Sequence, residues 1–145
     1  MAGPSLEHTT NKDSAMTKPA PCPCGGADYA TCCGPILAGT PAASAEQLMR
    51  SRYTAYTRND EAYIAATWAK STRPAPVAVS DDSTKWLGLE IRHSSTDGES
   101  AIVEFIARYK INGRAQRLHE VSRFVREQGC WFYVDGSFPE STRTP

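Results

Sequence analysis

The chain has 145 residues, and its 16 basic and 16 acidic side chains give a formal net charge of zero at pH 7. This length fits one main domain with its own hydrophobic core, while the balanced charge excludes a bulk attraction to nucleic acid or to an anionic membrane surface. No apolar run approaches the roughly 18 residues of a membrane span, so the sequence predicts no membrane partner and disfavours nucleic acid.

Residues 1–20 are mostly polar or small, and we expect them to form a disordered lead-in. They lack the apolar core of a signal peptide, which favours a cytoplasmic protein. Both Met1 and Met16 are candidate starts of translation.

Residues 21–40 hold four of the five cysteines, in the stretch "PCPCGGADYATCCGP". In a reducing compartment, clustered cysteines are more often metal ligands than disulfides, and four thiolates can surround a zinc ion at about 2.3 Å each. Gly25 and Gly26 allow the sharp backbone turns that such a site needs. The pattern predicts one structural zinc ion per chain, with every coordination position filled by sulfur. Its ligands would be Cys22, Cys24, Cys32 and Cys33.

Other uses of these thiols stay open on the sequence alone. They could be inert reduced cysteines or a disulfide pair, although Pro, Gly, Asp and Thr surround them instead of the apolar residues typical of inert thiols. An iron–sulfur cluster is the main competing metal site, but its cysteines are usually more widely spaced.

Two helices are expected after the cysteine loop. A Ser44 N-cap and Gln47 form a capping-box pattern before a helix over about 45–58. A second helix is expected within 59–70, capped by Asn59 or Asp60. The proline-containing stretch that follows predicts a loop, with a short helical turn near Trp86.

The rest of the chain has the pattern of four strands in an antiparallel meander. The expected strands are 86–94, 101–111, 114–127 and 130–138, and the last two connections are "NG" and "QG" turns. Helices followed by such a sheet predict an α+β fold over residues 41–140, with a short tail at 141–145.

The block "LHEVSRF" holds the first candidates for chemistry, His119 and Glu120. A histidine in a pocket could act as a general base. Adjacent strand residues point to opposite faces, however, so both cannot line one pocket without a bulge. We therefore favour a structural role, in which His119 bonds to a buried group and Glu120 pairs with an arginine such as Arg52 or Arg123. His119 is kept as a candidate, and no catalytic residue is assigned.

Several separate blocks resemble one known family. "CPCG…YATCCG" resembles the SEC-C motif, a small zinc hook, and "LMRSRYTAYTRNDEAYIAATW" and "LHEVSRFVREQGCWFYVDG" resemble the YchJ family. That resemblance implies zinc ligands at the four clustered cysteines. It also implies a nuclear-transport-factor-2-like (cystatin-like) domain, with helices packed on a curved four-stranded sheet. The lysines with which the related SecA hook binds partners are missing here, and the family implies no particular activity.

Two functions follow from these observations. The first is a zinc-binding cytosolic adaptor or binding module, with a protein partner or a small apolar ligand, and with a homodimer through the sheet as one arrangement. The alternative is a dehydratase- or isomerase-like enzyme that uses His119, with Asp135 or Tyr53, in a pocket of the α+β domain. We favour the non-enzymatic function.

Overall fold

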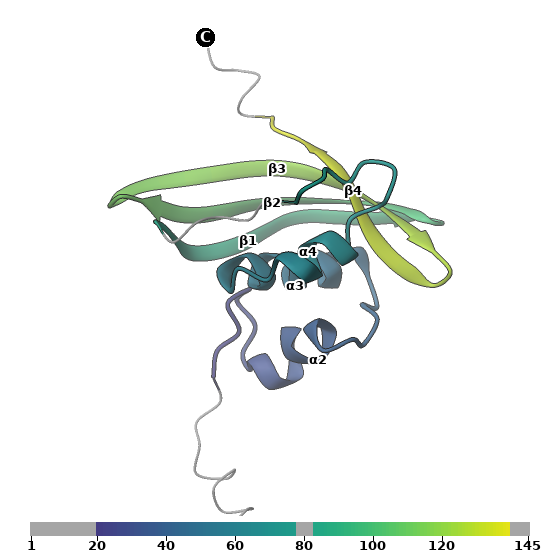
Figure 1. The fold of residues 1–145 in the computed structure, drawn as a ribbon, viewed down its shortest axis with the longest axis horizontal. Helices are drawn as coiled ribbons and strands as arrows, with labels where there is room; N and C mark the ends of the chain where they lie inside the picture. Colours follow the sequence, from purple (N-terminus) through teal and green to yellow (C-terminus); the bar gives the residue numbers. More distant parts are fainter. Residues whose placement is uncertain (1–19, 78–82, 140–145) are drawn as a thin grey trace, which may run out of the picture.

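A computed structural model of the chain describes residues 20–77 and 83–139. All of the expected lead-in except Ala20, the tail at 141–145 and the two candidate starts of translation lie outside these residues. Figure 1 shows the sheet arching over the helices, and the short helix α2 (Cys33–Leu37) lies on the far side of the longer helices from the sheet. The elements in chain order are η1 (Tyr29–Thr31), α2 (Cys33–Leu37), α3 (Ala45–Thr57), α4 (Glu61–Ala66), β1 (Thr84–Asp97), β2 (Ser100–Ile111), β3 (Arg114–Glu127) and β4 (Cys130–Ser137).

The two expected helices are present. The Ser44 hydroxyl accepts a hydrogen bond of 3.1 Å from the backbone N–H of Gln47, as the capping box predicts, and α3 ends at Thr57. Asp60 caps α4. This helix is shorter than expected because the backbone beyond it pairs with β4. The N–H of Tyr133 donates to the carbonyl of Thr67 at 2.8 Å.

The four strands form one antiparallel sheet in the order β1-β2-β3-β4, which confirms the meander. The "NG" and "QG" turns have positive φ angles at both positions, as tight hairpin turns of this type require. The helical turn expected near Trp86 is wrong, because Trp86 lies within β1 and pairs with Tyr109. No helix among the described residues has the length and hydrophobicity needed to cross a membrane.

The pairing of the sheet is irregular at three places. The register of β1 against β2 shifts between Trp86 and Gly88, and again between Ile91 and His93. On β4, Tyr133 lies opposite Phe124 and Asp135 lies opposite Arg123, so Val134 is an extra residue. This bulge turns Asp135 away from the face that carries Tyr133. Strict alternation along residues 130–138 predicts that Tyr133 and Asp135 share one face of the sheet, and the bulge shows that this prediction is wrong.

One continuous hydrophobic core joins the cysteine segment, α3 and the sheet. Val103, Phe105 and Ala107 of β2 are buried on the helix-facing side, as their alternation predicts. They belong to the same cluster as Leu48 and Met49 of α3, and this cluster also contains Cys22, Cys24 and Cys33. The cysteine segment is thus packed into the domain that follows it.

Candidate metal centre and adjoining cavity

The four clustered cysteines converge on one point. Their Sγ atoms all lie within 4.8 Å of one another, and none of the four forms a disulfide. Four sulfur atoms at about 2.3 Å from a zinc ion would be about 3.8 Å apart in a tetrahedron, so small side-chain movements suffice to bind it. Cys22, Cys24 and Cys33 are buried, and Cys32 is partly exposed. The donor set therefore fits a metal that prefers four sulfur ligands.

The backbone around Cys22 and Cys24 forms the turn that the glycines predict. The N–H of Gly25 donates to the carbonyl of Cys22 at 2.9 Å, and the N–H of Cys22 donates to the carbonyl of Gly26 at 3.0 Å. Gly25 has a φ of 105°. A Cβ atom on Gly26 would lie 2.7 Å from the Sγ of Cys32, which is too close. Glycine at position 26 thus lets the backbone approach the sulfur cluster.

Helix α3 supports this site from one side. Nη1 of Arg50 donates to the carbonyl of Cys24 at 3.1 Å and lies 3.9 Å from its sulfur. The Sγ of Cys22 lies 3.8 Å from the hydroxyl oxygen of Thr54. A four-thiolate zinc site carries a net charge of about −2, so a guanidinium beside it offsets part of that charge.

The thiols interact so that negative charge is favoured on one sulfur atom, that of Cys24. A hydrogen bond with the Cys33 thiol lowers the pKa of Cys24 to about 4, although burial opposes this shift. The same interaction raises the pKa of Cys33, and burial raises the pKa of Cys32 to about 11. A cation that bound all four sulfurs would displace the remaining protons, since thiolates are the metal ligands.

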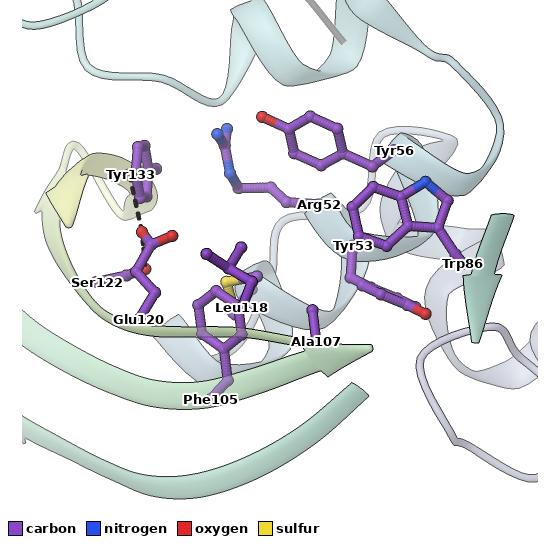
Figure 2. A pocket seen from close by; sticks show the side chains of 11 residues that line it. Arg52, Tyr53, Tyr56, Trp86, Phe105, Ala107, Leu118, Glu120, Ser122 and Tyr133 are labelled. Atoms are coloured by element: carbon purple, nitrogen blue, oxygen red, sulfur yellow. Dashed lines mark hydrogen bonds between the residues drawn. The ribbon is translucent and has the colours of Figure 1, made fainter. Parts of the chain in front are cut away.

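A second feature lies between α3 and the sheet. It is a cavity of about 220 Å³, lined by Tyr53 and Tyr56 of α3, Trp86 of β1, Phe105 of β2 and Leu118 of β3. Figure 2 shows these side chains around a central space. The walls are mainly apolar and aromatic, as is usual for small-molecule sites.

One end of the cavity is charged. Arg52 is 3% exposed and Glu120 is 7% exposed, and both line the cavity. Nη1 of Arg52 donates to the carbonyl of Ile64 at 3.0 Å and to the hydroxyl of Thr67 at 2.7 Å. Its guanidinium lies 4.5 Å from the ring centroid of Tyr133. Burial lowers the pKa of Arg52, while nearby tyrosines and Glu120 oppose this shift.

The Glu120 carboxylate is held by two hydroxyl groups. Its Oε2 accepts hydrogen bonds from Ser122 at 2.7 Å and from Tyr133 at 3.0 Å. Burial raises the pKa of Tyr133, and the charge of Glu120 adds to the shift, so this hydroxyl stays protonated and donates. Among the described residues no ion pair joins Glu120 to Arg52 or Arg123. The expected arginine partner is therefore wrong, and Arg123 pairs with Asp135 instead.

His119 does not line the cavity. It pairs with Ile106 on β2, one position away from the pairing of Glu120 with Phe105, and so faces the outer side of the sheet. Its Nε2 lies 2.7 Å from Oε2 of Glu104. The sequence correctly separates His119 from Glu120, but it does not show which of the two faces inward.

The comparisons with known proteins agree with this fold and this cluster. The family model described as the middle NTF2-like domain of YchJ matches residues 44–136. A UPF0225 protein of Ralstonia nicotianae is 51% identical, with 84% of this chain and 96% of that protein covered. One from Cupriavidus metallidurans is also 51% identical, with 90% and 98% covered.

Two solved structures are similar over the same region. The solution structure of a SEC-C motif containing protein from Rhodopseudomonas palustris has a TM-score of 0.73 and 37% identity, and covers 82% of this chain and 98% of its own. The crystal structure of a SEC-C motif containing protein from Psychrobacter arcticus has a TM-score of 0.68 and 27% identity, and covers 81% and 82%. With the family-model match, the relatives and the four-cysteine cluster in agreement, the chain belongs to the YchJ (UPF0225) family and carries an SEC-C motif.

Proposed function

We propose that this protein is a zinc-binding adaptor or binding module of the cytosol. The observation that supports zinc is the convergence of four sulfur atoms within 4.8 Å in a largely buried cluster. Four thiolates complete a tetrahedral shell, so a zinc ion held here has a structural role and no position for a reacting water. Five cysteines without a disulfide also fit a reducing compartment.

The first test is the metal content of the protein purified without added metal. We expect about one zinc ion per chain and no visible absorbance, because four closely spaced cysteines suit zinc better than an iron–sulfur cluster. Elemental analysis by mass spectrometry measures this ratio. Iron with visible absorbance, or protein that stays folded without binding any zinc, would contradict the assignment.

The cleft between the cysteine segment and α3 supports the proposal that a protein partner binds here. It has a volume of about 500 Å³ and is lined by Ala27, Asp28 and Thr31 on one side and by Glu46 and Arg50 on the other. Charged groups of both signs at the rim of an open cleft suit a polar protein surface. The enzymatic alternative built on His119 lacks this support, because His119 lies outside the cavity.

The adaptor function is tested by placing a bulky cation in the cleft. Ala27 is exposed, so we expect the Ala27→Arg variant to retain zinc. Because this residue lines the cleft, the variant should bind at least tenfold more weakly any protein that the parent retains from a cell extract. The matched control is Ala115→Arg, which changes an exposed residue of β3 that does not line the cleft. Equal retention of the same proteins by both variants would count against the cleft as the binding surface.

A further inference from the structure

The cavity between α3 and the sheet is large enough for a small molecule. A cavity of about 150 Å³ can hold benzene, so 220 Å³ can hold one ring with a short substituent. Trp86 and Tyr53 pack edge to face at 5.5 Å between ring centroids, and Trp86 lies 6.1 Å from Tyr56. These aromatic walls favour a flat ligand. None of residues 21–40 lines the cavity, so this inference does not depend on the zinc site.

The other end of the cavity combines a donor and an acceptor. Figure 2 shows Arg52, Glu120 and Tyr133 gathered at one end, away from Trp86. The hydroxyls of Ser122 and Tyr133 both donate to Oε2 of Glu120. Nη1 of Arg52 donates to the carbonyl of Ile64 and the hydroxyl of Thr67, and the guanidinium also interacts with the hydroxyl of Tyr56. A carboxylate has two acceptor oxygens and a guanidinium has five N–H donors. Each group therefore keeps capacity for a further hydrogen bond.

The charges at this end also limit the ligand. Arg52 and Glu120 contribute one positive and one negative charge, so their sum favours neither an anion nor a cation. Burying two such charges costs free energy unless their hydrogen bonds are satisfied, and apolar residues would usually stabilise a core as well or better. Two buried charged groups that keep hydrogen-bonding capacity at the wall of a cavity are thus better explained by ligand recognition than by stability.

We infer that this cavity binds a neutral, planar molecule of about one ring that carries a donor and an acceptor side by side, as an aromatic or cyclic amide does. The amide N–H would donate to Glu120, the amide carbonyl would accept from Arg52, and the ring would lie between Trp86 and Phe105. No covalent bond is made or broken in this binding step.

Benzamide is a suitable probe, and its close analogues test each part of the inference. We expect isothermal titration to show binding of benzamide, with at least tenfold weaker binding of ethylbenzene, benzoate and benzylamine. Ethylbenzene lacks the polar group. Benzoate and benzylamine each carry a charge, which the balanced charges of Arg52 and Glu120 do not favour. Equal binding of ethylbenzene and benzamide, or no binding of benzamide, would overturn the inference.

A cavity-filling variant locates the site. Ala107 is buried and lines the cavity, so Ala107→Leu should weaken the binding of benzamide at least tenfold. Ala115→Leu, on the exposed part of β3, should leave this affinity unchanged. Amide chemical shifts of the unmodified protein provide a second readout that does not depend on a variant folding. Shift changes should cluster at Ala107, Glu120 and Trp86. Changes confined to other regions, or unchanged affinity in a folded Ala107→Leu protein, would refute the assignment.

Discussion

Replacing Cys24 by Ser is expected to abolish tight zinc binding and to lower the free energy of unfolding by about 4 kcal/mol, the value for loss of a ligand present at a thousand times its Kd. Cys24 is fully buried within the cluster that joins the cysteine segment to α3 and the sheet. For a chain of this length the melting temperature should fall by roughly 10–15 °C. Far-UV circular dichroism at low temperature should still show the sheet, since most of its core contacts are retained.

The control for this change is the fifth cysteine. Cys130 is exposed at the start of β4 and lies outside the cluster, so Cys130→Ser should keep both the zinc content and the melting temperature of the parent. If the Cys24→Ser protein had the same melting temperature as the parent, the cysteine segment would contribute nothing to the stability of the domain. One that is unfolded even at low temperature would show that the α+β domain cannot fold without the metal.

The second large effect is expected at Gly136, which lies on β4 opposite Ser122. A Cβ atom here would overlap the Glu120 carboxylate, and this carboxylate is fixed by hydrogen bonds from Ser122 and Tyr133. Gly136→Ala should therefore destabilise the protein by about 3 kcal/mol, at the upper end of the range for overpacked cores. Chemical denaturation measures this change.

Two further variants identify the cause. Gly88 lies in β1 with open space around it, so Gly88→Ala should change the unfolding free energy by less than about 0.5 kcal/mol. Combining Gly136→Ala with Glu120→Ala removes the group that the new methyl would overlap, and the double variant should recover part of the loss. A double variant whose loss is the sum of the two single losses would show that the two residues do not interact.

Local signals in the chain were enough to predict most of the fold. The capping box before α3, the alternation along β2 and the "NG" and "QG" turns each act within a few residues, and all are present in the structure. The cysteine spacing likewise pointed to the cluster. Helix α4 is shorter than its pattern indicates because Thr67 bonds to β4, a contact that no local pattern contains.

The cavity was harder to predict because it depends on which face of β3 turns inward. Alternation shows that His119 and Glu120 lie on opposite faces, but both faces carry charged and apolar residues, so the pattern does not indicate the inner one. The bulge at Val134 is the other obstacle. One extra residue turns Asp135 to the outer side, where it pairs with Arg123, and its only local sign is the small Gly136 that follows.

The irregular pairing of β1 has a consequence for self-association. A four-stranded meander has two edges, and at the β4 edge the backbone of Tyr133 is already bonded to Thr67 and Ala69. The β1 edge carries two register shifts, and such irregularities twist an edge strand so that a second copy cannot extend the sheet along its whole length. Edge-to-edge stacking into fibrils is therefore disfavoured at both ends of the sheet.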